Sequence, residues 1–221
     1  MAQQNIKQII KQEYIKCAKD PVYFMKKYCW IQHPTRGRVQ FNLYPFQEGT
    51  LKLLQKHDRS ISLWMMVFQK DKAILVVATK QDTAKNLVTK VKFMYDNLPS
   101  WLQIGFTENN KLALRLKNGS QVKAVSAASD AGRSEAISLL IIDEAAFIEG
   151  NRIEEIWGAS QQTLSTGGKA IVLSTPNGTG NFFHRMWNKA EEGTNGFVPI
   201  KLHWTVHPER NQEWRNKQDD E

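Results

Sequence analysis

The sequence is poor in the features that mark secreted and membrane proteins. Its 221 residues contain only two cysteines, Cys17 and Cys29, too few for a disulfide framework, and no CxxC motif or Cys/His cluster indicates zinc. No stretch approaches the ~20 consecutive apolar residues that a membrane span requires. Residues 1–7 also lack the apolar core of a signal peptide. We therefore expect no membrane association and a reducing, cytosolic setting.

The composition is otherwise that of a globular protein with a basic surface. Hydrophobic residues make up 41% of the chain, and its length is enough for one substantial core, or one core with a small appendage. The formal net charge is +8, which favours contact with a polyanion. The lysines are spread along the chain, so the charge alone does not locate a binding surface.

The stretch that carries the most chemical information is 138–147, SLLIIDEAAF. Four aliphatic residues, Leu139–Ile142, run directly into Asp143 and Glu144, a pattern typical of a strand buried on both faces in a parallel α/β sheet. Ligands of such sheets bind outside the carboxyl ends of the strands. One carboxylate at that place can hold a hydrated Mg²⁺ while its neighbour orients or deprotonates a water. The alternative is a strand that simply ends in an acidic turn.

Strand and helix patterns alternate along most of the chain, which predicts an α/β fold. Apolar runs predict further buried strands at 73–79, 170–178 and 198–204. Helical patterns cover 5–30, 80–91 and 182–191. The dipeptide Asn118-Gly119 predicts a hairpin turn, and Asp20-Pro21 is typical of a helix start.

These elements divide the chain into three predicted parts. A helical appendage covers 1–38 and ends in a loop at 33–38, an α/β core covers 39–205, and a polar tail covers 206–221. Because the tail is so polar, we do not expect it to pack against the core.

Near the start of the core, Tyr44-Pro45-Phe46-Gln47 resembles the adenine-reading segment of helicase-like and packaging ATPases. The amide of Gln47 can pair with the N6 and N7 edge of adenine, and an aromatic ring such as Tyr44 can stack on its face. A buried Tyr-Pro-Phe turn is the alternative interpretation of the same residues.

The order of motifs closely resembles the N-terminal ATPase half of the large terminase subunit of tailed phages, particularly the T4-like group. The motifs are Tyr-Pro-Phe-Gln, Ala-Thr-Lys-Gln, Gly-Arg-Ser, Leu-Ile-Ile-Asp-Glu-Ala-Ala-Phe-Ile and Leu-Ser-Thr-Pro-Asn-Gly. The resemblance spans roughly residues 35–215. The resemblance implies a three-layer P-loop NTPase sheet of the RecA-like (ASCE) type with helices on both faces. It also implies a motor that pumps DNA into a procapsid.

The resemblance assigns roles to particular residues. Asp143 would be the Walker B aspartate that helps hold Mg²⁺, and Glu144 the catalytic carboxylate that positions the water. Ser174 and Thr175 would belong to the coupling motif that senses the γ-phosphate. Tyr44 and Gln47 would read adenine, and Arg133 lies in a loop that would approach nucleotide or DNA.

The same resemblance implies cofactors, partners and a location. The cofactors would be ATP and Mg²⁺. The partners would be double-stranded DNA, the portal protein and the small terminase subunit, with a homo-oligomeric ring on the portal in the host cytoplasm. A nuclease domain follows the ATPase in this family, and the chain reaches its last residue, Glu221, where that domain would begin.

The phosphate-binding loop of the family is missing from the expected place. It requires a buried strand, a Gly-rich turn with a cation and a Ser or Thr, and then a helix. Only 27 residues separate Gln47 from Ile74, and the segment from Arg59 to Trp64 passes from one helix towards the next. We infer that about 20 residues, including a central strand and the loop, are absent relative to the family.

Two other segments imitate part of such a loop. Gly167-Gly168-Lys169 has a Gly-Lys pair but precedes a strand instead of following one. Residues 127–134 fit a loose Ala-x4-Gly-Arg-Ser pattern after a strand, but only 9 residues then lead to Asp143. A crossover between parallel strands needs a dozen or more, so a basic DNA-contacting loop or a plain surface loop is the better interpretation of 127–134.

The leading hypothesis is therefore a terminase ATPase domain that is weak or inactive in ATP hydrolysis, because its phosphates would lose their main electrostatic cradle. Whether the chain is an enzyme stays open at this point. One alternative is a non-catalytic DNA- or portal-binding module derived from a terminase. Another is a fragment of a superfamily 2 helicase, which Asp-Glu-Ala-Ala also resembles.

Overall fold

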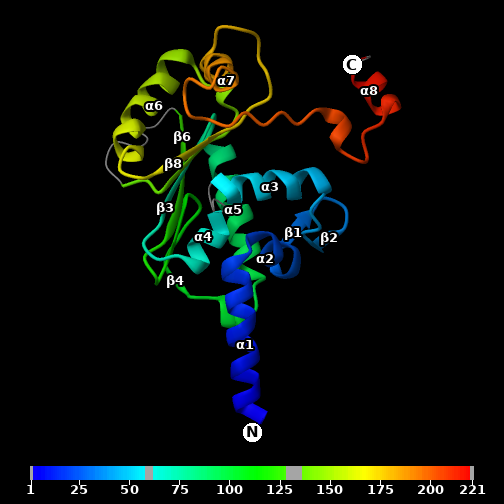
Figure 1. Cartoon of the computed structure of the whole chain (residues 1–221), viewed down its shortest axis with the longest axis vertical. Helices are drawn as coiled ribbons and strands as arrows, with labels where there is room; N and C mark the ends of the chain where they lie inside the picture. The colour runs from blue at the N-terminus through cyan, green and yellow to red at the C-terminus, as the bar shows by residue number, and fades with distance from the viewer. Residues whose placement is uncertain (1, 58–61, 128–135, 220–221) are drawn as a thin grey trace.

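A six-stranded sheet in the order β4-β5-β6-β3-β7-β8 organises the computed structural model, which describes residues 2–57, 62–127 and 136–219 (Figure 1). Its strands are β3 (Ala73–Ala78), β4 (Phe106–Asn109), β5 (Ala113–Leu116), β6 (Gln121–Ser126), β7 (Leu139–Ile142) and β8 (Lys169–Val172). β3 pairs in parallel with β6 and with β7, and β7 pairs in parallel with β8. β5 pairs antiparallel with β6, and β4 pairs antiparallel with β5 at the end of the sheet. The mostly parallel α/β sheet is as predicted.

Helices cover both faces of this sheet (Figure 1). On one side lie α2 (Pro21–Tyr28), α3 (Pro45–His57), α4 (Ser62–Phe68) and α5 (Gln81–Asp96). On the other side lie α6 (Gly150–Leu164) and α7 (Phe182–Glu191). The long helix α1 (Ala2–Lys19) points away from the body, and α8 (Gln212–Asp219) lies near the C-terminus.

The two helical layers create two hydrophobic cores. Successive side chains of a strand point to opposite faces, so Ile74 and Val76 of β3 enter one core and Leu75 and Val77 enter the other. The first core contains Trp64 of α4 and residues of α2 and α5, and the second is closed by α6 and α7. This double burial explains why β3 and β7 consist of unbroken apolar runs.

Several local predictions are confirmed. The carboxylate of Asp20 accepts a hydrogen bond from the backbone N–H of Tyr23 (3.0 Å), and Pro21 is the first residue of α2. Asn118 and Gly119 form the turn between β5 and β6, where Gly119 has a φ of +85° that glycine adopts without strain. The Asn118 amide also donates to the carbonyl oxygens of Met66 and Gln69, which fastens the turn to the end of α4.

Three local predictions are wrong. Residues 33–38, expected as a loop, take part in a short hairpin of β1 (Trp30–His33) and β2 (Gly37–Gln40). Residues 198–204, expected as a strand, join no ladder in the described structure, because the sheet ends at β8 and Pro199 has no N–H to donate. The tail from His207, expected not to pack, places the His207 ring 4.8 Å from the ring of Tyr44 and forms α8.

The segment between α3 and β3 is described only in part. Its described part contains the helix α4 and no strand, and residues 58–61 lie outside the described residues. Leu63–Val67 are all buried, which accounts for an apolar run of this length without a place in the sheet.

Among the described helices, none is long and apolar enough to cross a membrane.

A three-donor network around Glu13 ties α1 to α2. Oε1 of Glu13 accepts hydrogen bonds from the hydroxyl of Tyr23 (2.6 Å), the ammonium of Lys27 (2.7 Å) and the hydroxyl of Tyr28 (2.8 Å). The Lys27 bond, followed by that of Tyr23, lowers the pKa of Glu13 from 4.5 to about 2. The ionised carboxylate therefore favours the folded state.

We predict that Glu13→Gln lowers the free energy of unfolding at pH 7 by about 1–2 kcal/mol, the range of charge-assisted hydrogen bonds near a surface. The pKa of Glu13 is lowered in the folded state, so its contribution is complete above about pH 4.5 and is lost as the pH falls towards 2. Denaturant unfolding of both proteins between pH 7 and pH 3 measures the difference, which should shrink with falling pH.

Glu155→Gln is the matched control, because Glu155 is 52% exposed and its ion pair is with Arg152, one helical turn away. A Glu13→Gln effect that equals this control, or that stays constant with pH, would contradict the prediction.

Candidate functional site

The two acidic residues lie at the carboxyl end of β7, next to the turn that follows β8. Ile142 pairs with Val172 in the parallel ladder, so Asp143 and Glu144 emerge beside Leu173 and Ser174. The Leu173 N–H donates to the carbonyl oxygen of Ile142 (3.0 Å), and the Leu173 carbonyl oxygen accepts from the N–H of Ala145 (3.1 Å). The sheet therefore sets the distance between the two turns.

Side chains continue this attachment beyond the ladder. The Ser174 hydroxyl accepts a hydrogen bond from the N–H of Ala146 (3.1 Å), and the Asn177 amide donates to the Ala146 carbonyl oxygen (3.2 Å). Neither Asn177 nor Ala146 was singled out in the sequence as a site residue. The signal for Asn177 was its position in the polar turn directly after a predicted strand.

Glu144 occupies an unusual backbone conformation at this junction. Its φ of 52° and ψ of 45° are left-handed, a region that costs a residue with a Cβ roughly 1–2 kcal/mol. The turn directs its carboxylate towards β8, with Oε2 lying 3.5 Å from the hydroxyl oxygens of both Ser174 and Thr175. These contacts are at the long limit of hydrogen bonding, so the carboxylate is held weakly.

Asp143 is half-buried beside Glu144, and this position raises the pKa of its carboxyl group. Burial is the larger cause, and the negative charge of Glu144 is the next. A divalent cation would relieve both effects, since it supplies positive charge and accepts carboxylate oxygens as ligands. The donor chemistry therefore fits the predicted magnesium site.

The segment Tyr44–Gln47, which was predicted to read adenine, has other neighbours than Asp143 and Glu144. The side-chain oxygen of Gln47 accepts the backbone N–H of Tyr44 (3.0 Å) at the start of α3. The Tyr44 ring stacks on Phe46 with an interplanar angle of 9°, and its hydroxyl donates to Glu209 (3.1 Å). Tyr44 thus contacts both Gln47 and the C-terminal tail, and none of these contacts reaches Asp143 or Glu144.

Neither of the two segments that resemble part of a phosphate loop is shown beside Asp143 in the described structure. Lys169 begins β8 opposite Leu139, which is the amino end of the parallel pair and the opposite end from Asp143. A Cβ at Gly168 would collide with the Ile137 carbonyl oxygen, so this glycine serves close packing. Arg133 and the rest of 128–135 lie outside the described residues.

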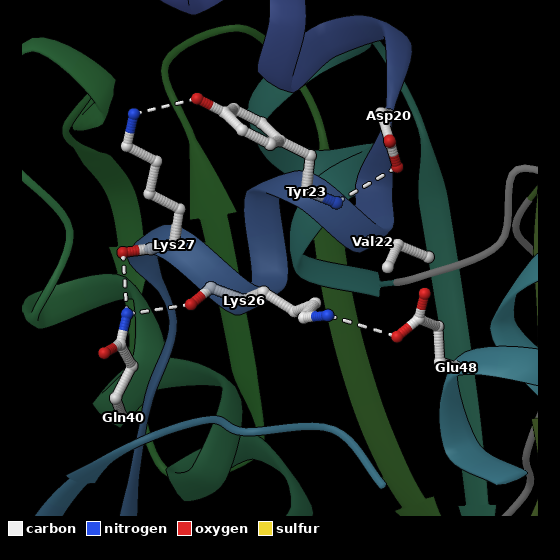
Figure 2. A pocket seen from close by; sticks show the side chains of 7 residues that line it. All are labelled: Asp20, Val22, Tyr23, Lys26, Lys27, Gln40 and Glu48. Atoms are coloured by element: carbon white, nitrogen blue, oxygen red, sulfur yellow. Dashed lines mark hydrogen bonds and ion pairs between the residues drawn. The ribbon is translucent and has the colours of Figure 1, made fainter. Parts of the chain in front are cut away.

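A shallow pocket lies between α2, β2 and α3 (Figure 2). Its lysines are already engaged, since Lys26 pairs with Glu48 (3.2 Å) and Lys27 with Glu13 (2.7 Å). Gln40 donates to the carbonyl oxygens of Lys26 and Lys27, which closes one wall. The residues that line this pocket are Asp20, Val22, Tyr23, Lys26, Lys27, Gln40 and Glu48. None of them is a site residue predicted from the sequence.

Comparison with known proteins decides the family. The model of the N-terminal part of the large terminase subunit, T4-like virus type, matches residues 59–217. The chain belongs to this family. Asp143, Glu144 and Ser174 lie within the matched stretch, whereas Tyr44 and Gln47 precede it.

Solved structures of large terminases share the fold. The HK97 bacteriophage enzyme gives a TM-score of 0.69 at 16% identity and covers 92% of this chain and 51% of that chain. The ATPase domain from Thermus phage P74-26 gives 0.50 at 23% identity over 71% of this chain and 73% of that chain. The large terminase from a thermophilic bacteriophage gives 0.57 at 10% identity over 80% of this chain and 50% of that chain.

At these identities the structural likeness establishes a P-loop-type fold, and the chain spans about half the length of the HK97 terminase. The family match and these structures are all terminases, so none supports the helicase alternative.

We predict that Glu144→Gly gives a protein more stable than Glu144→Ala by about 1 kcal/mol, because both variants lose the carboxylate and only alanine retains the left-handed penalty. At Glu155, within α6, the order should reverse, since glycine costs a helix interior about 1 kcal/mol relative to alanine. Thermal or denaturant unfolding of the four variants measures both differences. The same sign at the two positions would show that Glu144 does not adopt the left-handed conformation.

Proposed function

We propose that the chain provides the nucleotide-facing half of a viral DNA-packaging ATPase, and that by itself it hydrolyses ATP weakly or not at all. The observation that supports the first part is the junction of the 143–144 and 174–175 turns at the carboxyl ends of two adjacent parallel strands. Ligands of parallel α/β sheets bind at that edge, and carboxylates and hydroxyls are the groups that a Mg²⁺–nucleotide complex needs there.

Each residue has a role that its position allows. Asp143 holds a hydrated Mg²⁺, and this ion, when bound, offsets the negative charge of the phosphates. Glu144 orients the attacking water and accepts its proton. Ser174 and Thr175, which are 3.5 Å from Glu144, exchange their contact with this carboxylate for a contact with water or phosphate, and so pass the state of the site to β8.

The adenine-reading role of Tyr44 and Gln47 requires a rearrangement in this proposal. The tail residues His207 and Glu209 contact Tyr44, and the oxygen of Gln47 already accepts the Tyr44 N–H. Stacking of adenine on Tyr44 would need the tail to withdraw.

The second part of the proposal concerns the phosphates. Between α3 and β3 the described residues offer no strand followed by a Gly-rich turn, which is the arrangement that would supply backbone N–H donors and a cation to the β- and γ-phosphates. In the assembled motor, the proposed partners are double-stranded DNA, the portal protein and the small terminase subunit, with several copies in a ring on the portal in the host cytoplasm. A non-catalytic DNA-binding module is the second candidate, and the net charge of +8 favours it.

The decisive experiment is Mg²⁺-dependent ATP turnover by the purified chain, by its Glu144→Ala variant, and by a version that carries a family-type strand, phosphate loop and helix between α3 and α4. We expect the first two to be indistinguishable and the third to turn over ATP. A Glu144→Ala substitution in the third version should then abolish the gain.

Turnover by the unmodified chain that Glu144→Ala abolishes would contradict the proposed inactivity. A repaired version that binds ATP but shows the same turnover with and without Glu144 would contradict the role of this residue. ATP-independent DNA binding that weakens steeply with salt, without turnover in any version, would favour the binding module.

A further inference from the structure

The sheet has an unpaired edge at β8. The N–H groups of Lys169 and Leu173 donate to Ser138 and Ile142, so alternate residues of β8 direct their backbone groups towards β7. Ala170 and Val172, between them, direct their N–H and C=O groups to the outer side of the sheet. β8 is the last strand, and among the described residues no backbone partner reaches these groups.

The opposite edge of the sheet is built differently. β4 is polar and exposed at Thr107, Glu108 and Asn109, and its pairing with β5 is interrupted by a bulge between Phe106 and Glu108. Polar side chains and bulges are the usual devices that protect an edge strand from further pairing. β8 has neither device over Ala170–Val172, which is an apolar segment in regular register with β7.

An apolar side chain near this edge is also left uncovered. Leu173 is 42% exposed, whereas Leu139, Leu140 and Ile142 of the neighbouring β7 are buried. Leu173, at the carboxyl end of β8, therefore lacks apolar cover.

The charges beside the edge restrict what can cover it. Asp143 and Glu144 stand next to the turn that follows β8, 3.5 Å from the Ser174 hydroxyl in the case of Glu144. One end of an added strand would lie beside the turn that follows β8, two strand spacings (~9.6 Å) from β7. A long side chain at that end could reach towards Glu144, whose carboxylate contacts the Ser174 and Thr175 hydroxyls of this turn. A cation at that end gains attraction, and an acidic residue there would be repelled.

We propose that the β8 edge binds an extended segment of a partner chain, about four alternating Val or Ile residues with Arg or Lys at the end nearest Asp143 and Glu144. Backbone hydrogen bonds to Ala170 and Val172 supply the pairing, as in other cases of strand addition. The apolar side chains of the segment cover Leu173. This surface goes beyond the nucleotide chemistry proposed above and does not depend on it.

The test uses fluorescently labelled ten-residue peptides with four alternating Val and Ile residues between soluble Ser and Thr flanks. One peptide carries Arg after the apolar residues and another carries Arg before them, because strands add in either direction. Controls replace Arg by Glu, or methylate the backbone nitrogens on alternate residues. Fluorescence anisotropy with the full chain measures each dissociation constant.

We expect one Arg peptide to bind, the Glu version to bind at least tenfold more weakly, and backbone methylation to abolish binding. In the protein, Val172→Pro removes an outward N–H and should weaken binding at least tenfold, whereas Thr107→Pro, in the bulge of β4, should not. Circular dichroism and thermal melting verify that both variants are folded.

Absence of binding by both Arg peptides would overturn the proposal. So would binding that survives backbone methylation, or equal binding to a folded Val172→Pro variant. If Val172→Pro does not fold, the methylated peptides alone test whether binding depends on backbone hydrogen bonds, because they leave the protein unchanged. Peptide binding needs no nucleotide, so its failure is distinct from a failure of the proposed ATPase role.

Discussion

The arrangement of the site depends on the position of β7 between β3 and β8. Parallel pairing on both sides fixes where β7 ends, and therefore where Asp143 and Glu144 emerge. The same ladder brings Ser174 to the backbone of Ala146 and close to the Glu144 carboxylate. Because the two turns share hydrogen bonds, their positions at this edge of the sheet are fixed together.

Those parts of the structure that depend on local pattern were predictable from the sequence. The unbroken apolar runs of β3 and β7, the Asn118-Gly119 turn and the cap at Asp20 each have one dominant physical reading, and the structure confirms them. The apolar run Leu63–Val67 forms the helix α4, in which all five residues are buried.

The rest depends on partners that a single sequence does not reveal. Residues 198–204 have the alternation of a strand, but a strand exists only where a neighbour supplies the ladder, and the sheet ends at β8. The contact of the His207 ring with Tyr44 joins segments that are far apart in the sequence and has no local signal. The left-handed conformation of Glu144 was likewise not foreseeable, because such a position normally calls for glycine or asparagine.

The claim that the sheet ends at β8, with the two carboxylates of the site beside an unpaired edge, is most directly tested by amide hydrogen exchange in the free chain. We predict slow exchange at Leu173, whose N–H donates to Ile142, and fast exchange at its neighbour Val172, whose N–H faces outward. Equal protection of the two amides would mean that another segment already pairs with β8. This result would contradict the claim that the β8 edge is unpaired.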